Sequence, residues 1–208
     1  MLEICEEGRN LMLSFKLFPT NVYVREDCEI DNKKLSEIIF KKEKTEPSSN
    51  ISNVGGWQSK TNLYKDERFS EILKEVALCF QETIYEQINY KTGDTLIHGM
   101  WGNVNRYKDY NLTHSHGEAE WSFVYYVKVP KNSGNLVLVD PRVRRPESTT
   151  KGLIENHNNS FTHDIFLATP KEGHLILFPA WLEHYVECNE SKQPRISIAG
   201  NVEMRNEI

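Results

Sequence analysis

The second half of the chain contains short runs of apolar residues separated by turn-forming residues. A typical break is the segment 130–134, in which Pro, Asn, Ser and Gly occur close together. Many short apolar runs at such spacing are typical of a β-sandwich or a β-barrel. We predict strands over residues 96–107, 118–129, 136–140, 161–168, 173–178, 185–188 and 195–202.

Two segments in the first half have helical periodicity instead. A long amphipathic helix is predicted over residues 66–90, where apolar residues recur every three or four positions and would pack on a sheet. A shorter helix is predicted over residues 33–42, because Asp31 just before it suits the N-cap position. Residues 11–25 alternate well enough for one or two strands, and residues 46–56, rich in Ser, Asn and Gly, are predicted to form a loop.

The segment 142–160 has no apolar period and is rich in charged and polar residues. Long loops of this kind often have a function, typically as a lid or a substrate-binding insertion. We therefore expect this segment to shape the entrance to a binding site. No internal repeat or second domain is visible, so residues 1–208 are predicted to form one domain.

Composition narrows the possible functions. The net charge of −5 argues against general nucleic-acid binding, which needs a basic surface. No apolar run reaches the roughly 18 residues of a membrane span, and the acidic N-terminal residues do not resemble a signal peptide. The four cysteines are scattered without a CxxC pair, which indicates free thiols. We expect a cytoplasmic protein.

Candidate chemistry is concentrated in five residues that lie next to apolar runs. His114, His116 and Glu118 alternate, so in one strand they would project from the same face. His184 follows a later apolar run, and Arg195 begins another. Neutral imidazoles and a carboxylate suit a borderline metal such as Fe(II), whereas an arginine offers a rigid fork for a carboxylate. The pattern predicts a non-haem iron site with an acidic co-substrate.

Further residues are assigned by strand parity. Ser197 would share the face of Arg195 and could donate its hydroxyl to the same carboxylate. Tyr126 shares parity with His114 and His116, so an unbroken strand would direct its phenol into the same cavity, as a co-substrate contact or as a core tyrosine. The remaining histidines and three of the tryptophans are predicted to be structural, and Asp140 to cap a turn: His98, His157, His163, His174, Trp57, Trp101 and Trp181.

An ordered set of short motifs resembles the 2-oxoglutarate/Fe(II)-dependent oxygenase superfamily. More narrowly, it is similar to the small oxygenases of marine bacteria and their phages, and the resemblance runs from about Phe18 to Asn201. It implies a double-stranded β-helix, or jelly-roll, core over residues 95–204, supported by helices and strands from residues 1–94. The motifs are Gly55-Gly56-Trp57-Gln58-Ser59, Asn105-Arg106-Tyr107, His114-Ser115-His116, Ser122 with Tyr125-Tyr126, Gly134-Asn135-Leu136, Asp140-Pro141-Arg142, Phe178-Pro179-Ala180-Trp181-Leu182 with His184, and Arg195-Ile196-Ser197-Ile198-Ala199 with Asn201.

The metal ligands implied by the resemblance leave one choice open. The superfamily usually has His-x-Asp/Glu as its first motif, and this chain has histidine at the second position. One ligand set is His114, His116 and His184; the other replaces His114 by Glu118. Strand periodicity allows both, and the HxH pattern of the narrower family favours the first. Phe123 stands where relatives have glycine, and its bulk could reshape the pocket.

The resemblance implies an Fe(II)- and 2-oxoglutarate-dependent oxygenase, most simply a hydroxylase. The far carboxylate of 2-oxoglutarate would then bind to Arg195, Ser197 and Tyr126, and decarboxylation would be coupled to C–H oxidation. Two alternatives are a cupin-like three-histidine metalloenzyme that uses no 2-oxoglutarate and a jelly-roll binding protein without turnover. The substrate, a small molecule or a peptide, is not specified by the sequence, and neither is the oligomeric state; no nucleic-acid or membrane partner is expected.

Overall fold

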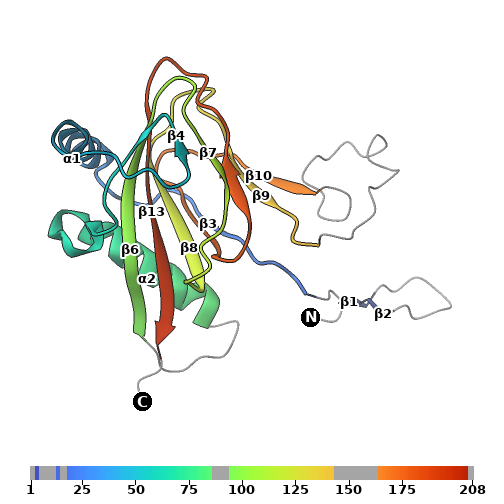
Figure 1. Cartoon of the computed structure of the whole chain (residues 1–208). Coiled ribbons are helices and arrows are strands. Elements are labelled where there is room, and N and C mark those ends of the chain that lie inside the picture. Colours follow the sequence, from blue (N-terminus) through green and yellow to red (C-terminus); the bar gives the residue numbers. More distant parts are fainter. Residues whose placement is uncertain (1–2, 5–12, 15–17, 86–93, 143–163, 206–208) are drawn as a thin grey trace.

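The computed structural model describes residues 3–4, 13–14, 18–85, 94–142 and 164–205 (Figure 1). Two antiparallel sheets face each other, one six-stranded in the order β3-β11-β8-β13-β6-β5 and one five-stranded in the order β10-β9-β12-β7-β4. The strands are β3 (Tyr23–Arg25), β4 (Asn53–Val54), β5 (Trp57–Gln58), β6 (Asp94–Asn105), β7 (Tyr110–His114), β8 (Trp121–Lys128), β9 (Leu136–Val139), β10 (Ile165–Ala168), β11 (Leu175–Pro179), β12 (His184–Val186) and β13 (Arg195–Arg205). A separate pair is formed by β1 (Glu3–Ile4) and β2 (Leu13–Ser14).

The path of the chain between the sheets identifies the fold. From β6 to β9 each strand enters the opposite sheet, β10 pairs with β9, and β11, β12 and β13 alternate again. This alternation confirms the predicted mainly β fold with a double-stranded β-helix core.

Alternate residues along the strands of the six-stranded sheet pack into two different hydrophobic clusters, one on each face of the sheet. In β8, Phe123, Tyr125 and Val127 face the helices, whereas Val124 and Tyr126 belong to the cluster between the sheets. The burial of both faces explains why β8 is a nearly continuous apolar run. Bulky Phe123 fits because its strand neighbour is Gly200, where an added Cβ would lie 2.6 Å from the ring.

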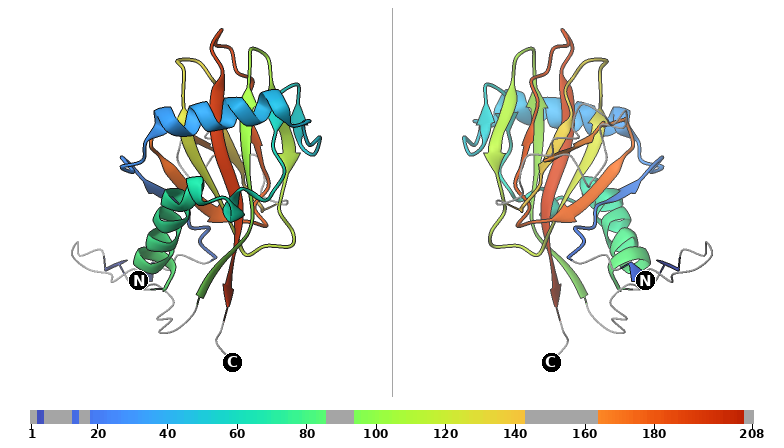
Figure 2. Two further views of the ribbon diagram at one scale, coloured as in Figure 1. Left: turned by 90° about the vertical axis from the view of Figure 1, so that its left-hand side faces the viewer. Right: turned by 90° about the vertical axis from the view of Figure 1, so that its right-hand side faces the viewer.

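Two helices cover the outer face of the six-stranded sheet (Figure 2). The first, α1 (Asn32–Thr45), begins after Asp31, whose carboxylate accepts a hydrogen bond from the backbone nitrogen of Lys34, as predicted for the N-cap. The second, α2 (Ser70–Cys79), continues into a π-helical turn over Phe80–Tyr85. Within the described residues no helix is long and apolar enough to cross a membrane.

Several predicted boundaries are wrong, and one matters for the site. The strand predicted over residues 118–129 begins at Trp121, and β7 ends at His114, so His114, His116 and Glu118 do not lie on one strand. Residues 115–120 connect the two sheets instead. Most of the predicted loop 142–160 and the end of the predicted helix 66–90 lie outside the described residues. Cys28, Cys79 and Cys188 are free thiols, as predicted.

Candidate metal centre

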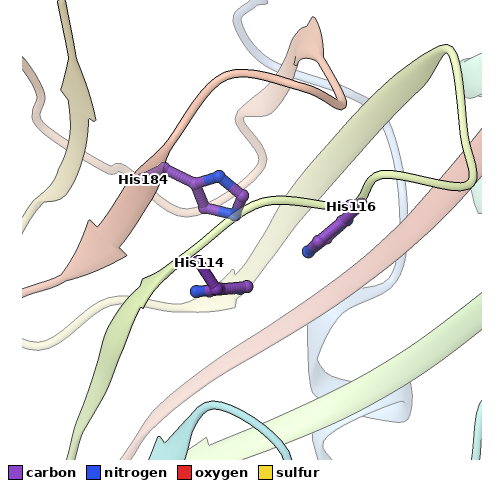
Figure 3. Close-up of side chains that lie close together, drawn as sticks. All are labelled: His114, His116 and His184. Atoms are coloured by element: carbon purple, nitrogen blue, oxygen red, sulfur yellow. The ribbon is translucent and has the colours of Figure 1, made fainter. Parts of the chain in front are cut away.

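Three histidines converge between the two sheets (Figure 3). One ring nitrogen from each of His114, His116 and His184 lies within 4.8 Å of the others. His114 is the last residue of β7 and His184 the first of β12, and their Cα atoms are register partners. His116 lies in the connection that follows β7. Two imidazoles therefore come from neighbouring strands of one sheet, and the third comes from the chain that leaves it.

The other nitrogen of each ring, Nδ1, is hydrogen-bonded to an oxygen acceptor. Nδ1 of His114 donates to the carbonyl oxygen of Leu112 at 2.7 Å, and Nδ1 of His184 donates to that of Leu182 at 2.8 Å. Nδ1 of His116 lies 2.7 Å from Oδ1 of Asn201 and is therefore the donor. With its proton on Nδ1, each ring has its lone pair on Nε2, which is the form that binds a metal.

Burial keeps these imidazoles neutral. Desolvation lowers the pKa of His114 and of His116 below the ordinary histidine value. The pKa of His184 is lowered to about 3, first by burial and then by the neighbouring His114. A neutral imidazole binds a cation without first losing a proton, so the triad suits a metal at neutral pH.

Sequence reasoning missed the residues that orient the rings. Asn201 and Ser122 lie on β13 and β8, and the Ser122 hydroxyl lies 2.8 Å from Nδ1 of His116. The Ser52 hydroxyl lies 3.3 Å from Nε2 of His114 and accepts a hydrogen bond from Nδ2 of Asn111 at 3.1 Å. Asn201 and Ser122 belong to motifs that carry the family resemblance, whereas no sequence signal points to Ser52 or Asn111.

Arg195 lies in the same cavity without an acidic partner. Its side chain is buried, and Nη1 donates to the backbone carbonyl of Ser133. Nη2 is buried and has no hydrogen-bond partner, and no carboxylate of the described residues forms an ion pair with the guanidinium. Desolvation lowers the pKa of Arg195. Because a buried charge is costly unless it is paired, this cation suits an anionic ligand.

Ser197 and Tyr126 lie beside Arg195 and are neighbours across the strands. Their Cα atoms are register partners on β13 and β8, and both residues line the cavity that contains the triad. Burial raises the pKa of Tyr126 to about 12, so its phenol is a hydrogen-bond donor at neutral pH. Tyr126 reaches this cavity because the two sheets face each other, and the unbroken strand predicted to link it to the histidines does not exist.

Other candidates lie elsewhere. Glu118 is exposed in the connection after His116 and does not belong to the group of converging ligand atoms. Trp57 is buried, as predicted for a packing residue. Trp181 is 52% exposed, so the packing prediction is wrong for this residue. Trp101 packs against His116, with ring centroids 5.5 Å apart, and also lines the cavity. Asp140 accepts a hydrogen bond from the backbone nitrogen of Arg142, as a turn cap does. His157 and His163 lie outside the described residues.

The fold is a jelly roll, and the three histidines between its sheets form a group that could hold a metal ion. Residues 99–201 match the family model described as "Putative 2OG-Fe(II) oxygenase". The chain belongs to this family of 2OG-Fe(II) oxygenases, which are non-haem iron enzymes. A comparison with curated proteins gives no match.

Solved structures share the fold at low sequence identity. A prolyl-4-hydroxylase from Pseudomonas putida has a TM-score of 0.61 at 12% identity, over 90% of this chain and 94% of that protein. A viral collagen prolyl hydroxylase from Paramecium Bursaria Chlorella virus-1, solved as a 2OG complex, has a TM-score of 0.55 at 13% identity, over 87% and 94%. HygX from Streptomyces hygroscopicus, solved with nickel and 2-oxoglutarate bound, has a TM-score of 0.57 at 9% identity, over 88% and 83%.

Proposed function

We propose that the protein couples the decarboxylation of 2-oxoglutarate to the hydroxylation of a C–H bond, with Fe(II) held by His114, His116 and His184. The substrate class is a small molecule or a peptide. The neutral imidazoles with lone pairs on Nε2 support this ligand set, because they match the preference of a borderline metal for nitrogen donors. Glu118 is not proposed as a ligand, since it is exposed and lies outside the triad.

One observation carries the assignment of the co-substrate: the buried, unpaired Nη2 of Arg195 in the cavity of the triad. In our proposal the far carboxylate of 2-oxoglutarate accepts hydrogen bonds from Arg195, Ser197 and Tyr126. A guanidinium offers two parallel donors that match a carboxylate, and the two hydroxyls add further donors. A cupin-like three-histidine enzyme without 2-oxoglutarate would leave this guanidinium without a partner.

The residues of the chain bind the metal ion and the co-substrate, orient the three imidazoles and exclude water. When bound, Fe(II) supplies open coordination positions for the 2-oxo acid and O₂, and the oxidising chemistry that follows. The carbonyls of Leu112 and Leu182 and the Asn201 amide keep the three imidazoles in one tautomer. Phe178 and Leu136 give the cavity apolar walls, which limit the access of water to the reacting groups.

An assay of succinate release tests this function. Protein loaded with Fe(II) should convert 2-oxoglutarate to succinate slowly without substrate, and His184→Ala should abolish this reaction. Arg68→Ala, which removes an exposed arginine paired with Asp66, is the control and should keep wild-type turnover. Metal binding without any succinate would favour a binding protein, and oxygen consumption independent of 2-oxoglutarate would favour the cupin-like enzyme.

The cellular setting and the loop are part of the same proposal. Free thiols at three described cysteines support a reducing compartment, which we propose to be the cytoplasm, or the host cytoplasm if the gene is carried by a phage.

We further propose that the segment 142–160 closes over the substrate. Deletion of its middle should leave metal and 2-oxoglutarate binding intact and should abolish coupled substrate oxidation; a deletion variant that does not fold would show that the segment belongs to the core.

A further inference from the structure

The inner face of the six-stranded sheet has a row of polar residues next to Arg195. Across β8, β13, β6 and β5, the register places Tyr126, Ser197, Asn103 and Gln58 side by side. Neighbouring strands are about 4.8 Å apart, so Tyr126 and Asn103 flank Ser197 on its two sides. The next row contains Arg195 and Asn105. Asn103 and Tyr126 therefore lie on opposite sides of Ser197.

Asn103, like the buried Asn105 in the next row, has no hydrogen-bond partner for its side chain among the described residues. It is 8% exposed and lines the cavity of the triad, and its side-chain amide makes no hydrogen bond to another described residue. Among the buried asparagines, the amides of Asn111 and Asn189 donate to a Ser52 hydroxyl and to the Asn105 carbonyl. The Asn103 amide therefore has free donor hydrogens at the cavity wall, and a ligand that enters the cavity can accept a hydrogen bond from them.

The rows also place Asn103 relative to the two ends of the cavity. His116 is anchored by Asn201 and Ser122, which form one row. Four residues along β13, or about 13 Å of strand, separate Asn201 from Ser197, whereas Arg195 is only two residues from Ser197. The Asn103 amide is thus close to the carboxylate-binding end of the cavity and further from the row that anchors the metal ligand.

We propose that Asn103 is a further co-substrate-binding residue, whose amide Nδ2 donates a hydrogen bond to the far carboxylate of the 2-oxo acid. This inference rests on the proposed function. The carboxylate would lie over Ser197 with the Arg195 guanidinium at one end and with Tyr126 and Asn103 on its two sides. Asn103 thereby favours 2-oxo dicarboxylates over 2-oxo monocarboxylates of the same length.

The test measures equilibrium binding without turnover, by calorimetry on protein loaded with Ni(II). Asn103→Leu removes the amide, and Asn103→Asp keeps its size but adds a charge that repels the carboxylate. The dissociation constant for 2-oxoglutarate should rise about tenfold in the leucine variant, as for the loss of one hydrogen bond to a charged group, and more in the aspartate variant. Binding of 2-oxopentanoate, which lacks the far carboxylate, should change less than about twofold in Asn103→Leu.

A matched variant distinguishes a binding role of Asn103 from a structural one. Gln58 belongs to the same row and is buried, but it does not line the cavity. Gln58→Leu removes its amide and should therefore leave 2-oxoglutarate affinity within about twofold of wild type. An equal loss of affinity for both 2-oxo acids in Asn103→Leu would mean a structural role. Unchanged 2-oxoglutarate affinity in Asn103→Asp would overturn the inference alone. If the wild-type protein did not bind 2-oxoglutarate, the proposed function itself would be wrong.

Discussion

At the scale of single residues, the site depends on which nitrogen or oxygen is left without a protein partner. The Nδ1 atoms of the triad are satisfied by oxygen acceptors, whereas Nη2 of Arg195 is unsatisfied. Buried polar groups are nearly always hydrogen-bonded, so a buried exception in a cavity points to a ligand.

Arg195→Ala should weaken 2-oxoglutarate binding by about 1.5–3 kcal/mol, the magnitude of a hydrogen bond to a charged group. Arg195→Lys should also weaken it, because lysine keeps the charge and loses the planar fork. Isothermal titration of the metal-loaded protein without oxygen measures both affinities. Wild-type affinity in Arg195→Ala would favour the three-histidine enzyme that does not use 2-oxoglutarate.

The metal-free protein should lose stability as the pH falls below the ordinary histidine pKa of 6.5. The His184 pKa is lowered to about 3 by burial, so between these values the unfolded chain binds a proton that the folded chain does not. Because of His184, the free energy of unfolding at about pH 5 should be about 2 kcal/mol lower than at neutral pH.

Urea unfolding in the presence of a chelator, at about pH 7 and about pH 5, measures this loss. His184→Gln has no titrating group and should show a smaller difference between the two pH values. Equal differences in wild type and variant would mean that His184 does not remain neutral in the folded protein.

At the scale of elements, the loop before β9 holds Arg195 in place. The carbonyl of Ser133 accepts a hydrogen bond from Nη1 of Arg195, and Gly134 follows with φ of +84°. A Cβ on Gly134 would lie 2.6 Å from the carbonyl oxygen of Glu187 and 2.8 Å from that of Cys188. The loop therefore needs glycine for its conformation and for its close approach to the chain after β12.

Gly134→Ala should lower the free energy of unfolding by more than about 1 kcal/mol, since alanine is strained at positive φ and meets backbone atoms. It should also weaken 2-oxoglutarate binding, because the shifted carbonyls no longer hold the guanidinium. Gly117→Ala is the control: an added Cβ there meets nothing within 4 Å, so stability should change by less than about 0.5 kcal/mol. Urea unfolding and titration calorimetry measure the two effects, and equal stability of both variants would contradict the prediction.

At the scale of the whole molecule, the triad connects the two sheets. His114 and His184 belong to the five-stranded sheet, whereas His116 is anchored to β8 and β13 of the six-stranded sheet. A metal bound by all three would therefore hold the sheets together. The organisation of residues 1–208 as a single domain, with a supporting part over 1–94, stays a prediction.

Saturation with Ni(II) should raise the melting temperature by about 5–10 °C. A ligand at about 100 times its dissociation constant stabilises the folded state by about 2.7 kcal/mol, and each kcal/mol shifts the transition of a chain of this size by about 2–4 °C. His184→Ala should show almost no shift, because two imidazoles hold the ion less tightly. Thermal unfolding with and without metal measures this effect, and a full shift in His184→Ala would place the metal elsewhere.

The sequence alone determined the elements whose signal is local. Short apolar runs between turn-forming residues located most strands, the three- and four-residue period located the helices, and Asp31 marked the start of α1, because these patterns depend on the geometry of one element. It also singled out the three histidines and Arg195, whose chemistry is unusual within apolar runs.

Only the tertiary structure decided which of these residues meet. β7 stops at His114 opposite His184, and the chain then crosses to the other sheet. The periodicity that put Glu118 on the same face as His114 therefore does not hold beyond this point. The anchoring of His116 by Asn201 and the place of Asn103 beside Ser197 depend on cross-strand register, which pairs residues far apart in the sequence and leaves no local pattern.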